Sequence, residues 1–223
     1  MKKKILIIAA HPDDEVLGCG GAIIKHLKQK DSVYIMFLTN GISSRTKNYR
    51  KLNDRKKHAL NCAKFLGIKK TFFSNFPDNK LDSTPLLDII KKIEKISKKV
   101  KPSLVYTHYF GDLNIDHQKV FEAVNVAFRP TKKSLVKEIR CFEILSSSEW
   151  RIQKSKIFVP NLYINIESEI KKKTEALKFY EDELRKFPHS RSIEGINILA
   201  KYRGIQSGKK FAEGFIIVKK IEN

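Results

Sequence analysis

Short apolar runs alternate with longer segments of helical spacing along the first 130 residues. The runs Lys4–Ala10, Ser32–Thr39 and Ser103–Thr107 are almost continuously apolar, which is typical of strands covered on both faces. Between them, apolar residues recur three or four positions apart, which predicts helices. The predicted helices are Glu15–Lys30, Tyr49–Phe65, a helix from Ser83 through Ile96, and His117–Phe128, with a short strand at Thr71–Phe73.

The later part of the chain is less regular. It predicts strands at Glu138–Leu145, Leu162–Ile166 and Phe211–Val218, and helices at Glu167–Lys186 and Ser192–Tyr202. Strands that alternate with helices indicate βαβ units and a mostly parallel sheet. The chain has neither a low-complexity linker nor an internal repeat. We therefore expect one α/β domain over residues 1–223, with a Rossmann-like, mostly parallel sheet, helices on both faces and a C-terminal capping region.

The chain is strongly basic, with 45 Lys and Arg against 24 Asp and Glu and a formal net charge of +21. Such a surplus allows one interpretation as a basic, non-catalytic α/β protein that binds nucleic acid. Most of the basic residues are lysines, however, and they are dispersed over predicted polar helix faces and turns. Dispersed charge is more typical of a solvated surface or of attraction for an anionic substrate. No specific nucleic acid is therefore expected.

Composition excludes several classes of protein. Hydrophobic residues make up 41% of the chain, which argues against intrinsic disorder. No apolar run approaches the ~20 residues of a membrane span, and charged residues follow the first apolar run at once, which is wrong for a signal peptide. The predicted location is the cytoplasm. The scattered cysteines, Cys19, Cys62 and Cys141, show neither metal spacing nor a disulfide framework and are expected to be buried free thiols.

The first candidate site is the segment His11-Pro12-Asp13-Asp14, between the first predicted strand and its helix. In an open α/β sheet, ligands bind outside the carboxyl ends of the strands, where the strand order reverses. His11 and Asp14 are three positions apart, so one turn can aim both at one point, and this pair suits Zn²⁺. Asp13 is left for proton transfer. The alternative is a simple helix cap, with Asp13 or Asp14 as the capping residue.

The second candidate site follows the strand Ser103–Thr107 and ends at His117. In a doubly wound sheet this strand lies beside the first one, so its carboxyl end faces His11 and Asp14. His117 is then a natural third ligand. Two histidines and one aspartate with an open position form the pattern of a catalytic zinc, although other divalent ions also fit. Taken alone, this segment equally fits a cap and the first turn of a helix.

Several neighbours of these candidates also carry chemistry. Asp116 or Asp112 is placed to orient a ligand histidine, and we predict Asp116 because it adjoins His117. His108 directly follows a strand and is expected to lie in the core or line the pocket rather than bind the metal. Two further histidines inside predicted helices are expected to be structural: His26 and His58.

A nucleotide-binding α/β protein without a metal is a third interpretation. It requires a glycine-rich phosphate loop, and Gly18, Gly20 and Gly21 do not form one. Late in the chain, the segment Phe187–Arg191 lies between two predicted helices. It is either a plain turn or a loop that contacts substrate, and Arg191 is the candidate for a phosphate contact if the substrate is nucleotide-linked.

The string Ala10-His11-Pro12-Asp13-Asp14-Glu15, with Asp112-x-Asn114-x-Asp116-His117 downstream, resembles the PIG-L/LmbE-like family of N-acetylglucosaminyl deacetylases. The segments Ser146–Trp150 and Arg203–Phe215 are also similar to that family, so the resemblance covers nearly the whole chain. It implies a zinc-dependent hydrolase that removes an N-acyl group from an amino sugar. The implied partner is a small-molecule substrate that is free, nucleotide-linked or part of a glycoconjugate.

The resemblance also implies roles for individual residues. It gives the same three zinc ligands, His11, Asp14 and His117, with Asp13 as the general base. In relatives, an arginine of the helix after the second strand contacts the substrate. Arg55 matches it best, although two other arginines are close in sequence: Arg45 and Arg50.

The chain departs from the family pattern at two positions, one of which is His58, where relatives often carry an acidic residue. Many relatives carry a histidine where this chain has Asn114. An amide can donate a hydrogen bond to a developing oxyanion but cannot give up a proton. The resemblance therefore implies oxyanion support from Asn114 without a second acid. The oligomeric state is not predicted.

Overall fold

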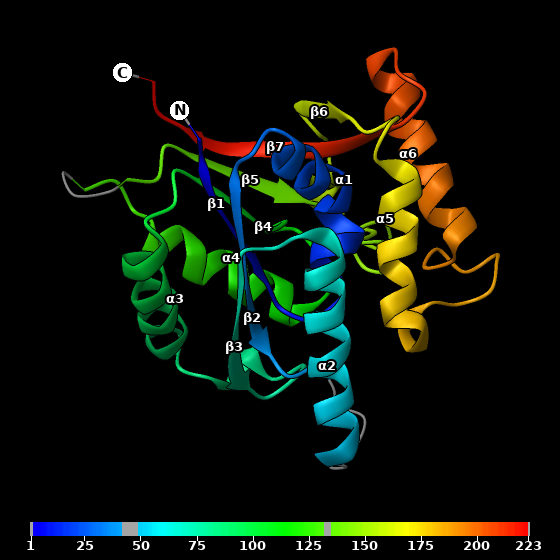
Figure 1. Ribbon diagram of the computed structural model, residues 1–223. Coiled ribbons are helices and arrows are strands. Elements are labelled where there is room, and N and C mark those ends of the chain that lie inside the picture. The colour runs from blue at the N-terminus through cyan, green and yellow to red at the C-terminus, as the bar shows by residue number, and fades with distance from the viewer. Residues whose placement is uncertain (1, 42–48, 132–134, 223) are drawn as a thin grey trace.

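Seven strands form one sheet in the described part of the chain, in the order β3-β2-β1-β4-β5-β7-β6 (Figure 1). This computed structural model describes residues 2–41, 49–131 and 135–222, with the backbone alone for residues 49–53. The strands are β1 (Lys4–Ala9), β2 (Ser32–Thr39), β3 (Lys70–Phe76), β4 (Leu104–His108), β5 (Glu138–Phe142), β6 (Leu162–Asn165) and β7 (Ala212–Lys220). Strands β1 to β5 are parallel, and β7 is antiparallel to β5 and β6.

Helices cover both faces of the sheet. They are α1 (Asp14–Lys28), α2 (Tyr49–Leu66), α3 (Leu86–Val100), α4 (Ile115–Ala127), α5 (Ile170–Leu177) and α6 (Ile193–Ser207). Alternate residues of β1 face two separate cores. Ile5 and Ile7 pack with residues of α1, α2, α5 and α6, whereas Leu6 and Ile8 pack with α3 and α4. The α/β fold predicted from the sequence is confirmed.

The strand order places the carboxyl ends of β1 and β4 side by side. From β1 the chain crosses to β2 and β3 on one side and then returns to β4 on the other. The order therefore reverses between β1 and β4, where ligands bind in sheets of this kind. Both candidate segments follow these two strands, as the sequence predicts.

Helix α1 is broken near its middle, at Cys19, where the backbone leaves the helical region (φ −146°, ψ 25°). The break frees backbone N–H groups that a continuous helix would use. Glu213 of β7 accepts hydrogen bonds from two of them, Gly21 N and Ala22 N, both at 2.8 Å. Lys173 of α5 pairs with Glu213 at 2.7 Å and also donates to a carbonyl oxygen before the break. A buried ion pair from the later part of the chain thus caps both sides of the break.

One predicted element is wrong in its extent. The sequence predicts a continuous helix over Glu167–Lys186, but α5 ends at Leu177 and a 3₁₀ helix follows at Lys178–Glu183. The backbone of Tyr180 is non-helical (φ −114°, ψ 38°). The physical reason is tertiary: the side chain of Tyr180 is 1% exposed and its hydroxyl bonds to a buried carboxyl of α1.

The remaining elements match their predicted positions with shifts at their ends. The predicted start of the third helix, Ser83, instead ends a 3₁₀ turn, and α3 begins at Leu86. Strand β5 ends at Phe142, not Leu145, because the chain then turns toward the site. The three cysteines are buried and free, as predicted. Among the described residues, no helix combines the length and the apolar character that crossing a membrane would require.

Candidate active site

The turn after β1 brings His11 and Asp14 together. Asp14 Oδ2 accepts a hydrogen bond from His11 N at 2.8 Å and lies 3.1 Å from His11 Nδ1. The turn is closed by a backbone bond from Asp14 N to His11 O at 3.3 Å. The three-residue spacing therefore aims imidazole and carboxylate at one point, as the sequence predicts.

His117, in the first turn of α4, completes a group of three. Its Nε2 lies 3.4 Å from His11 Nδ1 and 3.5 Å from Asp14 Oδ2. The three ligand atoms all lie within 4.8 Å of one another. Asp14 Oδ1 is buried and has no hydrogen-bond partner among the described residues. A buried carboxylate oxygen without a donor fits a cation, so these residues suit a divalent metal.

The histidines and carboxylates of this site shift one another's pKa values. Burial would raise the pKa of Asp14, but His117, His108 and His11 outweigh it and hold that pKa well below its usual range. Burial would lower the pKa of His117, but Asp112 and Asp14 outweigh this effect and raise that pKa to about 9. A metal ion binds the neutral imidazole. Binding of a metal ion here would therefore displace protons from the histidines.

Each of the two histidines in this group has a carboxylate on the far side of its ring. Asp112 Oδ1 lies 3.1 Å from His117 Nδ1, and Asp116 Oδ2 lies 3.1 Å from His11 Nε2. The prediction that Asp116 orients its neighbour His117 is wrong in its partner. Successive residues of a helix point in different directions, so Asp116 contacts His11 while Asp112 contacts His117.

Both of these carboxylates are held firmly. The hydroxyls of Ser147 and Ser148 donate to Asp112, from the turn after β5. Burial raises the pKa of Asp112, but His117 and the two serines outweigh it and lower that pKa to about 2. Asp116 accepts two backbone N–H bonds from the turn after β3. Their fixed positions in turn fix the rings of His117 and His11.

His108 lies behind the ligands rather than among them. Its ring stacks on that of His117, with centroids 3.8 Å apart and planes 13° apart. Its Nε2 accepts a hydrogen bond from Ala10 N at 2.8 Å, and the side chain is fully buried. This is the core position expected from the sequence. His26 is likewise engaged elsewhere, 3.0 Å from the Tyr106 hydroxyl.

Asp13 turns its carboxylate toward the pocket. It precedes α1 as the N-cap residue, but its side chain makes no capping hydrogen bond. Asp13 Oδ2 lies 3.3 Å from Arg191 Nη1 and 3.4 Å from Arg55 Nη2. Burial raises the pKa of Asp13, and the two arginines oppose that rise. The simple capping alternative therefore does not describe this side chain.

A polar pocket opens beside these residues. It is lined by His11, Asp13, Gly41, Arg55, Asp78, Asn79, Asn114, Glu183 and Arg191. The sequence did not indicate Asp78, Asn79 or Glu183. Asp78 and Asn79 follow β3 at the same edge of the sheet, which is a signal that could have found them. Glu183 has no local signal, because its position depends on the break in the predicted C-terminal helix.

Arg55 is buried against this pocket. Its Nη2 donates to Pro12 O at 2.6 Å, and its Nη1 pairs with Glu183 Oε1 at 2.6 Å. Arg55 thus lies on α2 in the wall of the polar pocket, and its contact with substrate stays a prediction. The other two arginines considered from the sequence cannot be compared with it, because Arg45 and the side chain of Arg50 lie outside the described residues.

Asn114 is the N-cap of α4. Its Oδ1 accepts hydrogen bonds from Asp116 N at 2.8 Å and His117 N at 3.3 Å. Its Nδ2 donates to Asn79 Oδ1 at 3.2 Å. An amide NH₂ carries two hydrogens, and one of them is used in the bond to Asn79. The other N–H of Asn114 is available to a further acceptor. Asn114 therefore combines a structural role with a place in the pocket wall.

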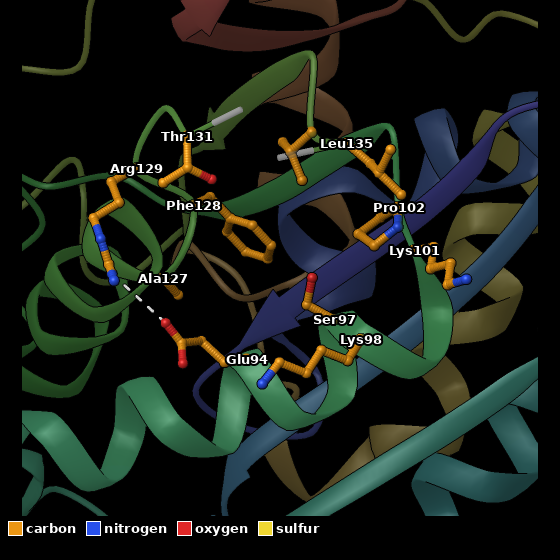
Figure 2. A pocket seen from close by; sticks show the side chains of 11 residues that line it. Glu94, Ser97, Lys98, Lys101, Pro102, Ala127, Phe128, Arg129, Thr131 and Leu135 are labelled. Carbon is orange, nitrogen blue, oxygen red and sulfur yellow. Dashed lines mark ion pairs between the residues drawn. The ribbon is translucent and has the colours of Figure 1, made fainter. Parts of the chain in front are cut away.

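A larger cavity of about 480 Å³ lies at the other end of the sheet (Figure 2). It is lined by residues that precede β4 and β5, such as Pro102 and Val136, together with the ends of α3 and α4. The described residues of its lining include no histidine and a single acidic residue, Glu94, which pairs with Arg129. Size alone would favour this cavity, but the reactive groups converge on the polar pocket at the carboxyl edge.

Comparisons with known proteins identify the family. The sequence model of the PIG-L family, described as GlcNAc-PI de-N-acetylase, matches residues 6–128. The uncharacterized deacetylase YaiS of Escherichia coli is 34% identical over 133 residues, covering 57% of this chain and 69% of that protein. The diacetylchitobiose deacetylase of Thermococcus kodakarensis is 26% identical over 235 residues, covering 97% and 83%.

The fold agrees with these matches. The conserved protein TT1542 of Thermus thermophilus has a TM-score of 0.80 at 21% identity, covering 99% of this chain and 97% of its own. The family model spans more than half of the 223 residues and includes every candidate metal ligand. The chain belongs to the PIG-L family of de-N-acetylases.

Proposed function

We propose that this protein is a zinc-dependent hydrolase that removes an N-acyl group, in the first place acetyl, from an amino sugar. One observation carries the proposal: His11, Asp14 and His117 converge within 4.8 Å beside the carboxylate of Asp13, which makes no capping hydrogen bond. The description of the family and the name of the Thermococcus relative support N-deacetylation of a sugar. Two histidines and an aspartate favour zinc over harder divalent ions.

Asp13 is the residue placed to move protons. When bound, the metal ion supplies a Lewis acid and lowers the pKa of a water molecule toward ~7. Asp13 then takes a proton from the attacking water and later returns it to the leaving amine nitrogen. Arg55 and Arg191 favour the ionised carboxylate against the effect of burial. The residue is thereby kept able both to accept and to release a proton.

Asn114 is the candidate donor to the developing oxyanion. It lines the same pocket, and its capping bonds fix its amide group in place. A preorganised donor is useful where it lies about 2.7–3.1 Å from the oxyanion position. Because an amide cannot release a proton, this assignment leaves Asp13 as the sole general acid and base of the proposed mechanism.

The charges of the pocket favour a neutral sugar as the bound group. Arg55 pairs with Glu183 at 2.6 Å, and Arg191 lies 3.3 Å from Asp13 and 3.6 Å from Glu183. These arginines already face carboxylates, which weighs against a phosphate contact at Arg191. Carboxylates, amides and guanidinium groups together offer the mixed donors and acceptors that sugar hydroxyls require. A nucleotide or glycoconjugate portion would then lie outside this pocket.

The test combines metal content with activity. Zinc would be measured by elemental analysis in the wild type, in His11→Ala and in the control His58→Ala, whose histidine lies on α2. Amine release from N-acetylglucosamine and diacetylchitobiose would be scored in the same samples. We expect near-stoichiometric zinc and activity in the wild type and the control, and neither in His11→Ala.

The absence of metal, with none taken up on addition of zinc, would contradict the proposal. The basic nucleic-acid-binding interpretation would then lead, and it predicts steeply salt-dependent binding that chelators do not affect. A single domain over residues 1–223 is part of the proposal, supported by the one sheet that joins all described strands. A cytoplasmic location stays a prediction.

A further inference from the structure

The backbone of Asp13 adopts a conformation that side-chain-bearing residues rarely take. Its φ is 126° and its ψ is −32°. The other non-glycine residues with positive φ in the described chain have values between 52° and 66°, inside the ordinary left-handed region. A residue in so sparse a region costs free energy and persists only where its surroundings hold it. At Asp13 this conformation turns the carboxylate out of the helix cap and toward the pocket.

Glu15 holds this conformation on one side. Its Oε2 accepts a hydrogen bond from Asp13 N at 3.0 Å, and its side chain is 1% exposed. On the other side, Asp13 O accepts from Val16 N at 3.1 Å and from Leu17 N at 3.0 Å, as the first turn of α1 requires. The two bonds to Asp13 O belong to the helix and would form with any residue at position 13. The bond to Glu15 is the contact specific to the unusual peptide.

Tyr180 fixes Glu15 in turn. Its hydroxyl donates to Glu15 Oε1 at 2.6 Å, and both side chains are almost completely buried. Tyr180 reaches this point because the backbone breaks there, between α5 and the end of the 3₁₀ helix. A continuous helix, which the sequence predicts, would not adopt this backbone geometry.

The same 3₁₀ helix also reaches the carboxylate of Asp13 by a second route. Glu183, three residues after Tyr180, pairs with Arg55 at 2.6 Å, and Arg55 Nη2 lies 3.4 Å from Asp13 Oδ2. The Arg55 guanidinium also lies over the Tyr180 ring, 5.9 Å from its centroid. One short segment therefore reaches the same residue by two routes, through Glu15 to its backbone and through Arg55 to its carboxylate.

We infer that Tyr180 and Glu15 are positioning residues, which hold the Asp13 peptide so that its carboxylate faces the reacting groups. This inference rests on the proposed role of Asp13 as the proton carrier. Neither residue needs to touch substrate or metal. Their effect is on orientation, and misplacing a reacting group by a fraction of an ångström is enough to slow catalysis.

The principal variant is Tyr180→Phe, which removes one hydroxyl and keeps the packed ring. Its matched control is Tyr106→Phe. Tyr106 lies on β4 and is also fully buried, and its hydroxyl accepts a hydrogen bond from Arg140 at 2.8 Å. We expect Tyr180→Phe to lower kcat about tenfold with KM and bound zinc unchanged. Tyr106→Phe should lower the thermal stability by about as much as Tyr180→Phe does, while its kcat stays at the wild-type value.

A second pair of variants tests the hydrogen bond itself. Glu15→Gln keeps an oxygen that can accept from Asp13 N, and its amide can donate to the Tyr180 hydroxyl. Glu15→Ala keeps neither. We expect Glu15→Gln to retain most of the turnover and Glu15→Ala to fall at least as far as Tyr180→Phe, again with zinc still bound.

The outcomes separate this inference from the proposed function. If Asp13→Asn, measured alongside, turns over at the wild-type rate, the proposed role of Asp13 fails and the inference fails with it. If Asp13→Asn is inactive but Tyr180→Phe matches Tyr106→Phe in kcat, only the inference is overturned. Loss of zinc from Tyr180→Phe, or a Glu15→Gln variant as slow as Glu15→Ala, would also overturn it.

Discussion

The two parts of the sheet contribute to the site in different ways. The ligand-bearing region, β1 through α4 (residues 4–127), supplies all three candidate metal ligands and the carboxylate of Asp13. The supporting region, β5 through β7 (residues 138–220), supplies no member of that group but contacts it both directly and through the residues around it. The direct contact is Arg191 on Asp13. The others are Ser147 and Ser148 on Asp112, Tyr180 on Glu15, Glu183 on Arg55, and Glu213 on α1.

This difference shows which part of the sequence carries the reactive residues and which part carries the residues that position them. The PIG-L family model matches residues 6–128, which is close to the ligand-bearing region. The residues that define the reaction therefore lie where the family is recognisable by sequence. The residues that orient them lie mostly beyond it, in a region whose strands are partly antiparallel. Changes in the two regions should therefore reduce turnover to different degrees.

Removal of the metal should have the largest effect. A chelator should reduce amine release to background, and added zinc should restore it, because no residue replaces the lost Lewis acid. The fold should remain, since the core is large and the ligands also bond to neighbouring protein groups. Circular dichroism of the chelated protein checks this, and a loss of helical signal would show that the supporting region cannot hold the site alone.

Asp13→Asn should come next. The amide cannot take a proton from water, so turnover should fall by about 10²–10⁴ while zinc stays bound. Steady-state rates and elemental analysis of the same sample provide the measurement. Near-normal turnover would remove proton transfer from Asp13 and leave the ligand-bearing region without an assigned base.

Replacing the carboxylates behind the histidines should have a smaller effect. Asp112→Asn should weaken zinc binding by about 10–100-fold, because His117 loses the partner that orients its ring. Asp116→Asn should act through His11 instead. Competition with a chromophoric chelator would measure both affinities. Equal, unchanged affinities would mean that these contacts do not tune the metal site.

Glu213→Gln should have the smallest effect on turnover. It leaves Lys173 buried without its charged partner, and breaking such a pair costs about 3–5 kcal/mol. The folded fraction should nevertheless keep a rate close to the wild type. Urea unfolding measures the loss, with Glu122→Gln, half of an exposed pair with Lys119, as a control that should not change the free energy of unfolding measurably.

The ligand-bearing region could be predicted from sequence because its signals are local. A continuous apolar strand followed at once by His11 and Asp14 places both at a sheet edge, and the βαβ pattern then brings His117 opposite them. The resemblance to a known family rests mainly on the same strings, with weaker similarity at Ser146–Trp150 and Arg203–Phe215. Sequence spacing could not decide which carboxylate meets which histidine, since that depends on the direction of Asp112 and Asp116 side chains.

The supporting region could not be predicted in the same way. Apolar spacing over Glu167–Lys186 fits a helix, and only the tertiary bond between Tyr180 and Glu15 explains why the helix breaks. Glu213 lies in a strand whose sequence gives no hint that its carboxylate caps a broken helix elsewhere. These contacts join residues more than 150 positions apart, and local periodicity holds no information on them.

The position of β7 has a consequence for the order of assembly during synthesis. This strand follows every other strand in the sequence, yet it lies between β5 and β6 in the sheet. The earlier residues leave the ribosome first, so all candidate ligands emerge long before Glu213 can reach the amides of Gly21 and Ala22. We therefore expect the break in α1 to stay uncapped until β7 has inserted between β5 and β6, so that this part of the newly made chain is completed last.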